Sequence, residues 1–230
     1  MNNIMLSKSS IKTYTQCPYK WKLKYIDKLK EPEGEALIRG SAAHKLIEVF
    51  YKTNVFFENG EFAFTDCDRE LYEFRELERR RMLALLNNKK DPQKYFFPLF
   101  QEKKILNNIL SLNGIVDAVY LNDADDEYIV IDYKTGKFDG TINKYRRELA
   151  FYKILLDNSK ILDKPVKYWG IIFVDHGVAI IEEAKAISIK ACWKAIERTR
   201  VGIVMKDFKK CPSPLCNWCG YCGKECDAIK

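Results

Sequence analysis

Residues 114–136 read GIVDAVYLNDADDEYIVIDYKTG, and the organisation of the whole chain can be worked out from this segment. Two runs rich in Ile, Val and Tyr flank the turn-forming stretch NDADDE, a pattern that predicts two antiparallel strands joined by a turn. Asp117 lies within the first run, and Asp132 and Lys134 end the second. Because residues two apart on a strand share a face, Asp132 and Lys134 project together, and Asp117 can converge on them from the neighbouring strand.

A carboxylate buried in such a strand is costly unless it has a partner, so each acid should be paired. Two acids at one point suit a hard divalent cation, since Mg²⁺ prefers oxygen ligands, commonly a carboxylate or two with waters and a phosphate oxygen. Lys134 could then orient or deprotonate an attacking water, or stabilise the charge that develops on a phosphorane. The alternative is a structural salt bridge between Lys134 and one acid at a solvated strand end, and the segment alone leaves both open.

On both sides of this segment the apolar residues recur with the spacing of a helix or of a strand. On its N-terminal side the pattern predicts helices over residues 7–30, 41–52 and 66–90, and a strand over 95–103. The segment itself belongs to strands over 108–121 and 128–134, which completes a meander of three strands. On its C-terminal side we expect a helix over 143–157, strands over 167–175 and 178–183, and a helix over 188–205. This order predicts an α/β (α+β) fold with a core sheet and flanking helices.

The 230 residues, 47% of them hydrophobic and 31% charged, describe a globular chain long enough to form one substantial core or two small ones, and we expect a single domain. We divide it into an N-terminal helical part (1–94), a core (95–205) and a cysteine-rich tail (206–230). The composition excludes collagen-like, coiled-coil and wholly disordered chains. No run reaches the ~20 apolar residues of a membrane-spanning helix, and the start MNNIMLSKSSIK lacks the apolar region of a secretory signal. We therefore expect a cytoplasmic protein without a membrane partner.

The eight cysteines are unevenly distributed, because five lie in the last twenty residues and the others, Cys17, Cys67 and Cys192, are scattered. The tail contains Cys211 and then a run with the spacing C-x2-C-x2-C-x3-C, formed by Cys216, Cys219, Cys222 and Cys226. In a reducing compartment this density indicates thiolate ligands of a metal. A zinc site would use all four thiolates of the run, whereas a ferredoxin-like cluster would use three and a distant fourth. The spacing leaves both metals open.

Five motifs, read in order, resemble the PD-(D/E)XK nuclease superfamily. They are SSIKTYTQCPYKWKLKY, RGSAAH, GIVD, DYKTG and the terminal CNWCGY…C, which together extend from Ser9 to Cys226. The resemblance is strongest to RecB-type exonucleases related to AddB and to the CRISPR-adaptation nucleases that carry an iron-sulfur cluster. It implies a restriction-endonuclease-like core with a mixed sheet. It also implies a Mg²⁺- or Mn²⁺-dependent deoxyribonuclease that acts as an exonuclease and could have endonuclease activity as well.

The resemblance also implies roles for individual residues. The metal ligands would be His44, Asp117, Asp132 and the backbone carbonyl of Tyr133, with Lys134 acting on the water nucleophile. A histidine on a helix face is more often a packing residue, but the RGSAAH context favours a ligand for His44. The other histidine, His176, has no such context, and we expect it at the surface.

In the helix after the lysine, the family has a Q-x-x-x-Y signature, whereas this chain has Glu148 and Tyr152 at those positions. Residues at i and i+4 share a helix face, so both could reach the DNA or Lys134. An acid would repel a phosphate unless it pairs with Lys134, Arg146 or Arg147. We assign Tyr152 to the catalytic set; the alternative is an ordinary helix with Tyr152 in the core.

For the cysteines, the resemblance implies a [4Fe-4S] cluster that joins the two ends of the chain. Cys17 would supply the first ligand, and Cys216 and Cys219 the next two. The family places the last ligand at a position that is glutamate here, so Cys226 or Cys222 must serve, and we favour Cys226. Cys67, Cys192 and Cys211 are not expected to be ligands. Zinc in the tail remains the alternative.

The expected partner is DNA. The formal net charge is +7, and seven lysines with interleaved aromatics lie between Lys8 and Lys30, suited to phosphate contacts. The aromatics are expected to pack inward rather than to stack on bases. Since no base-reading motif is visible, we expect single-stranded DNA or DNA ends to be preferred. The alternative is a non-catalytic DNA-binding scaffold of a recombination or CRISPR-adaptation complex, and a virus-encoded protein acting in its host cell fits the small size.

Overall fold

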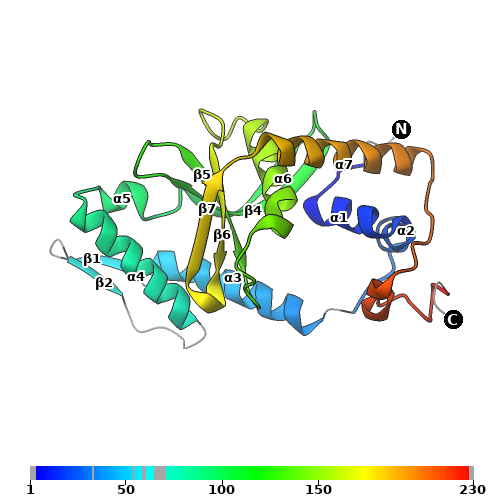
Figure 1. Cartoon of the computed structure of the whole chain (residues 1–230), viewed down its shortest axis with the longest axis horizontal. Helices are drawn as coiled ribbons and strands as arrows, with labels where there is room; N and C mark the ends of the chain where they lie inside the picture. The colour runs from blue at the N-terminus through cyan, green and yellow to red at the C-terminus, as the bar shows by residue number, and fades with distance from the viewer. Residues whose placement is uncertain (1–3, 33, 54, 59–60, 65–70, 228–230) are drawn as a thin grey trace.

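The computed structural model describes residues 4–32, 34–53, 55–58, 61–64 and 71–227 (Figure 1). Its centre is a five-stranded sheet in the order β3-β4-β5-β6-β7. The strands are β3 (Phe100–Asn107), β4 (Leu112–Leu121), β5 (Tyr128–Lys134), β6 (Tyr168–Phe173) and β7 (Val178–Glu183). All neighbours are antiparallel except β5 and β6, which are parallel. The predicted meander and mixed sheet with flanking helices are therefore confirmed.

The parallel pair follows from the connection between its strands. After β5 the chain passes through a short 3-10 helix, η2 (Asn143–Tyr145), and the helix α6 (Arg146–Asp157) before it returns as β6. A parallel pair requires such a long crossover, whereas the hairpin from β4 to β5 needs only the short NDADDE stretch. The crossover places α6 across the sheet, directly beside the strand that carries Asp132 and Lys134.

Helices cover both faces of the sheet (Figure 1). On one face, α6 and α7 (Ala186–Val204) build a core with the sheet in which Leu149, Trp169 and Ile196 are fully buried. On the other face, α3 (Glu35–Thr53), α4 (Tyr72–Asn87) and the short α5 (Pro92–Tyr95) surround an aromatic core. A two-stranded hairpin, β1 (Val55–Glu58) with β2 (Glu61–Phe64), follows α3.

The N-terminal segment forms two helices where one was predicted over residues 7–30. They are α1 (Lys8–Gln16) and α2 (Pro18–Tyr25). The helical conformation is interrupted at Cys17, whose backbone is extended. The residue before a proline is disfavoured in helical conformation, and Pro18 then occupies the first turn of the new helix. The Cys17 sulfur accepts a hydrogen bond from the Lys20 amide at 3.4 Å and so caps α2.

Leu6 attaches the start of the chain to the sheet. Its amide donates to the Ser111 carbonyl and its carbonyl accepts from the Asn113 amide, both at 2.9 Å, at the beginning of β4. The side chain of Leu6 is fully buried. Because Lys8 follows two residues later, this short bridge holds the first turn of α1 beside the sheet face that carries Asp132.

Other predicted boundaries differ in detail. The strand predicted over 95–103 is the end of α5 followed by β3, because Asp91 caps a short helix that Pro92 begins. The helix predicted from residue 41 begins at Glu35, and the hairpin of β1 and β2 was not predicted. The helix predicted over 66–90 is α4, and its first predicted residues, 66–70, lie outside the described part.

The cysteine tail follows α7 and packs against the N-terminal helices (Figure 1). It contains the 3-10 helix η4 (Pro214–Trp218), while a similar short helix, η3 (Val174–His176), connects β6 with β7. The hydroxyl of buried Tyr221 donates to the Leu29 carbonyl at 2.7 Å, and the Tyr19 amide donates to the Lys209 carbonyl at 3.1 Å. Within the described part of the chain, none of the helices is long and apolar enough to cross a membrane.

Candidate metal and active site

Three different parts of the fold bring ligand atoms together at the sheet. His44 comes from α3 and Asp117 from β4, and the third ligand atom is the backbone carbonyl of Tyr133 on β5. The Nε2 atom of His44 lies 3.3 Å from the Tyr133 carbonyl oxygen and 3.8 Å from Asp117 Oδ2. An imidazole nitrogen, a carboxylate oxygen and a carbonyl oxygen facing one another form a donor set suited to Mn²⁺ or Mg²⁺.

Asp132 lies beside this group and is only 1% exposed. Its Oδ1 accepts a hydrogen bond from Lys8 Nζ at 2.9 Å, and its Oδ2 lies 2.5 Å from Lys134 Nζ. Burial alone would raise the pKa of Asp132, but the two ammonium groups outweigh it and lower the pKa below the usual range. The structure therefore places Asp132 and Lys134 next to the ligand atoms of His44, Asp117 and Tyr133. The Asp132 oxygens face the two lysines and do not belong to the group of ligand atoms that lie within 4.8 Å of one another.

Two carboxylates of the site, Asp117 and Asp132, repel one another. Burial and the neighbouring Asp132 carboxylate raise the pKa of Asp117 to about 7, even though the Tyr133 amide donates to its Oδ2 at 2.9 Å. Burial opposes the charged form of His44, but a hydrogen bond with Glu102 and the charge of Asp117 outweigh burial and raise its pKa. Carboxylates that repel one another in this way are stabilised when a cation binds among them.

Glu102 was not singled out from the sequence. It lies on β3 directly opposite Asp117, between the pairs Gln101 with Ala118 and Lys103 with Val116. Its backbone φ of +45° falls in the left-handed region, which is uncommon inside a strand and costs on the order of 1–3 kcal/mol. Its Oε1 lies 2.8 Å from Nδ1 of His44. An Nδ1–H that donates to Glu102 leaves Nε2 free to face Asp117 and the Tyr133 carbonyl.

The ligand atoms of His44, Glu102 and Asp117 lie within 4.8 Å of one another, and no other such group of three His, Cys, Asp or Glu residues occurs in the described part of the chain. No sequence motif marks Glu102, which stands in the unremarkable stretch FQEKKI. Only the register of β3 against β4 identifies it, since Glu102 is the cross-strand neighbour of Asp117. The register could not be read from the sequence.

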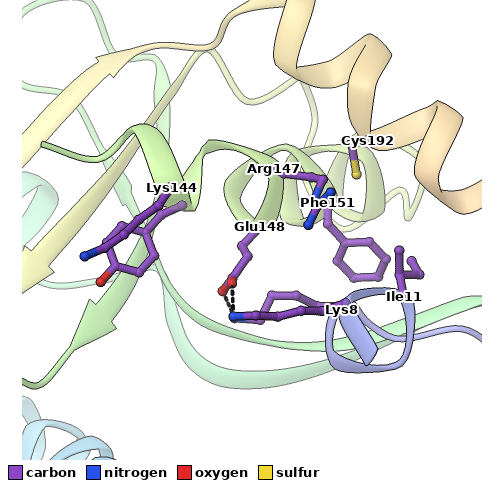
Figure 2. A pocket seen from close by; sticks show the side chains of 9 residues that line it. Lys8, Ile11, Lys144, Arg147, Glu148, Phe151 and Cys192 are labelled. Atoms are coloured by element: carbon purple, nitrogen blue, oxygen red, sulfur yellow. Dashed lines mark hydrogen bonds and ion pairs between the residues drawn. The ribbon is translucent and has the colours of Figure 1, made fainter. Parts of the chain in front are cut away.

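Glu148 on α6 connects two lysines of α1 with Lys134. Its Oε2 lies 3.5 Å from Lys8 Nζ (Figure 2). Its Oε1 accepts from Lys12 Nζ at 2.8 Å, and its Oε2 also lies 3.7 Å from Lys134 Nζ. Burial alone would raise the pKa of Glu148. The hydrogen bond from Lys12 and the nearby ammonium groups outweigh burial and lower this pKa. The acid thus pairs with Lys134, one of the partners expected for it, whereas Arg146 pairs with Glu182 at 2.6 Å.

Tyr152, one helical turn after Glu148, is 3% exposed and belongs to the core. Its ring also lies 4.5 Å beneath the Lys8 ammonium, at the site. Burial and the charge of Asp132 raise the pKa of Tyr152, so its hydroxyl stays protonated. Both interpretations of Tyr152 therefore describe part of its environment: it is a core residue that borders the site.

The cysteines form a second, separate group. Six of them line one cavity of about 200 Å³ between α2 and the tail: Cys17, Cys211, Cys216, Cys219, Cys222 and Cys226. No three of these six sulfurs lie within 4.8 Å of one another. Cys211, which was expected not to be a ligand, therefore lies beside the expected ligands. Cys192 is buried in α7, and Cys67 lies outside the described residues.

A family model described as the PD-(D/E)XK nuclease superfamily matches residues 5–223. A crystal structure named "Putative exonuclease" from Eubacterium rectale is similar, with a TM-score of 0.49 and 12% identity over 88% of this chain and 81% of that one. The structure of a protein named SSO0001 has a TM-score of 0.42 and 13% identity over 99% of this chain and 88% of that one. No curated protein matches the chain significantly.

We predict that Mn²⁺ stabilises the protein through His44. A ligand present at about 100 times its Kd stabilises the folded state by about 2.7 kcal/mol, which corresponds to a rise in Tm of roughly 5–10 °C for a chain of this size. His44→Ala should abolish most of this rise, because it removes Nε2 from the donor set. His176→Ala, which removes an exposed histidine bound only to the Gly136 carbonyl at 2.9 Å, should keep it. The Tm of each variant is measured by calorimetry with and without Mn²⁺. An equal rise in Tm in both variants would show that Mn²⁺ binds elsewhere.

Proposed function

This chain belongs to the PD-(D/E)XK nuclease superfamily, and we propose that it is a Mg²⁺- or Mn²⁺-dependent DNA exonuclease that hydrolyses phosphodiester bonds. The observation that carries the proposal is the convergence of His44 Nε2, Asp117 Oδ2 and the Tyr133 carbonyl oxygen beside the paired Asp132 and Lys134. A structural salt bridge of Asp132 with Lys134 would not explain why His44 Nε2 and Asp117 Oδ2 face each other beside it.

Each residue has a distinct role in the proposed reaction. His44, Asp117, Asp132 and the Tyr133 carbonyl would hold the cation, which supplies Lewis acidity at the phosphate when bound. Glu102 fixes the His44 ring so that Nε2 faces the other ligands. Lys134, held by Asp132 and Glu148, presents an ammonium group that orients the attacking water and stabilises charge on the phosphorane. Glu148 keeps this lysine in place rather than touching the phosphate.

The N-terminal lysines support a DNA substrate only in part. Lys8 and Lys12 reach the site, but Lys20 pairs with Glu31 at 2.5 Å and Lys22 with Asp27 at 2.6 Å. Trp21 is 1% exposed, so it packs inward as predicted and offers no surface for stacking on bases. A phosphate-directed contact without base reading favours single-stranded DNA or DNA ends, and partner proteins of recombination or CRISPR adaptation would supply further selectivity.

We further propose that the cysteine cavity holds a [4Fe-4S] cluster through Cys17, Cys216, Cys219 and either Cys226 or Cys222. Four thiolates bound to one zinc at ~2.3 Å in a tetrahedron lie roughly 3.8 Å apart. Here no three of the sulfurs come within 4.8 Å of one another, so they do not form such a group. A ring of thiols around a cavity of about 200 Å³ favours a larger cluster. The cluster would join α2 to the tail.

We predict that Asp132→Asn lowers DNA cleavage by about 10³-fold, because it removes a ligand charge worth several kcal/mol in the transition state. The assay is degradation of single-stranded DNA labelled at the 5′ or 3′ end, in the presence of Mn²⁺, and the label that is released first gives the polarity. Asp163→Asn is the matched control, since that exposed acid only pairs with the Tyr128 hydroxyl.

Full cleavage by the Asp132→Asn protein would overturn the nuclease proposal. A wild-type protein that binds DNA but never cuts it, under either metal, would instead indicate the DNA-binding scaffold. Because Asp132 neutralises two lysines, the Tm of Asp132→Asn should be measured beside its activity, and His44→Ala provides a second inactive variant with an intact Asp132.

We predict that anaerobically purified protein is brown, with absorption near ~400 nm from an iron-sulfur cluster. Cys17→Ala should lose this absorption and reduce the free energy of unfolding by on the order of 2–4 kcal/mol, as loss of a cross-link that closes a long loop does. Cys192→Ala, a buried cysteine of the core, should stay brown. Colourless wild-type protein that contains zinc, or a Cys17→Ala protein with unchanged colour and stability, would contradict the proposed cluster.

A further inference from the structure

A second cavity, of about 250 Å³, lies beside the metal site between α1, α6 and α7 (Figure 2). Its lining includes four cationic side chains, Lys8, Lys12, Lys144 and Arg147, and one acid, Glu148. We infer that this cationic cavity is a subsite for a phosphate of the DNA strand next to the phosphate that is cut. The inference rests on the proposed nuclease function and adds a specific contact to it.

The cationic side chains that line the cavity differ in whether they have an acidic partner. Lys8 and Lys12 pair with Asp132 and Glu148, and Lys144 pairs with Asp139 at 2.7 Å. Arg147, in contrast, forms no ion pair or hydrogen bond with any carboxylate in the described part of the chain. It is an exposed side chain on the first turn of α6, and Figure 2 shows it turned toward the cavity above Phe151. The cavity thus contains one cationic group that is available to an anion.

Lys8 connects the cationic cavity with the reacting centre. Its ammonium group lies 2.9 Å from Asp132 Oδ1 and 3.5 Å from Glu148 Oε2, and the same side chain lines the cavity. A strand whose scissile phosphate lies at Asp132 therefore passes its neighbouring phosphate across Lys8 toward Arg147. The two phosphate positions share one lysine.

The chemistry of the lining favours a phosphate of a nucleotide over a small inorganic anion. A guanidinium group has planar paired donors that match two oxygens of one phosphate. Phe151, Ile11 and the ring of Tyr145 provide apolar surface on which a sugar or base edge can lie. Glu148 removes one unit of positive charge, so the cavity is not built for a densely charged anion. Both an internal phosphodiester and a terminal phosphate of the strand have the required chemistry.

The test measures DNA binding in EDTA, where no cutting occurs, by fluorescence anisotropy of a labelled single-stranded oligonucleotide. Arg147→Ala should weaken binding about tenfold, the size expected for loss of a charge-assisted hydrogen bond. It should also reduce the slope of log K against log salt by about 0.7, as expected for one lost phosphate contact on a single strand. Arg147→Lys should recover part of the affinity.

Arg79→Ala is the matched control, because this exposed arginine belongs to α4 on the opposite face of the sheet. It should leave both affinity and slope unchanged. Because Arg147 is exposed, its variants should also keep the wild-type Tm. A single uncharged methylphosphonate next to the scissile position should weaken wild-type binding and have no effect on Arg147→Ala, since the two changes remove the same contact.

Oligonucleotides with and without a terminal phosphate distinguish the two sources of the anion. If Arg147→Ala weakens DNA binding only when the oligonucleotide has a terminal phosphate, the cavity binds a strand end. If it weakens binding to both oligonucleotides, the cavity binds an internal phosphodiester. Unchanged affinity and slope in Arg147→Ala overturn the subsite even if Asp132→Asn abolishes cutting. Binding through Arg147 by a protein that never cuts supports the subsite and overturns only the nuclease proposal.

Discussion

The buried charge of Asp132 is the constraint on which the arrangement of the site depends. An isolated ionised carboxylate inside a protein costs several kcal/mol, so its two oxygens require cations. One is Lys134, two residues along the same strand, and the other is Lys8, at the opposite end of the chain. Lys8 reaches Asp132 from the first turn of α1, which the hydrogen bonds of Leu6 to the start of β4 hold beside the sheet. Charge balance at one residue thus ties the N-terminus to the centre of the sheet.

The hairpin of β4 and β5 shows how much of the site could be predicted from the sequence. Alternating apolar residues and a polar turn identified both strands, and the spacing of Asp132 and Lys134 placed them on one face. Lys8 and Glu102 could not be assigned to the site in the same way. Their positions depend on contacts between distant segments, on the register of β3 against β4, and on a left-handed backbone at Glu102 that no local pattern indicates. The break at Cys17 was also missed, although Pro18 is a local signal for it.

The helices α1 and α6 contribute residues to the reacting centre and to the cationic cavity, and α1 also leads into the cysteine cavity. The helix α1 supplies Lys8 to Asp132 and Lys12 to Glu148, and its last residue precedes Cys17, which faces the tail. The helix α6 provides Glu148 to the reacting centre and Arg147 to the cationic cavity. A cluster that joins Cys17 to the tail would therefore stabilise the helix that delivers Lys8. Through this connection, loss of the cluster would also disturb the path proposed for the DNA strand.

The central claim is that a divalent cation binds where His44, Asp117 and the Tyr133 carbonyl meet. Crystals soaked in Mn²⁺ and measured for anomalous scattering test it directly. We expect one strong peak bounded by His44 Nε2, Asp117 Oδ2 and the Tyr133 carbonyl oxygen, with Asp132 turned toward it. A peak held by His44 Nδ1 and Glu102, or Mn²⁺ found only away from β4 and β5, would contradict it.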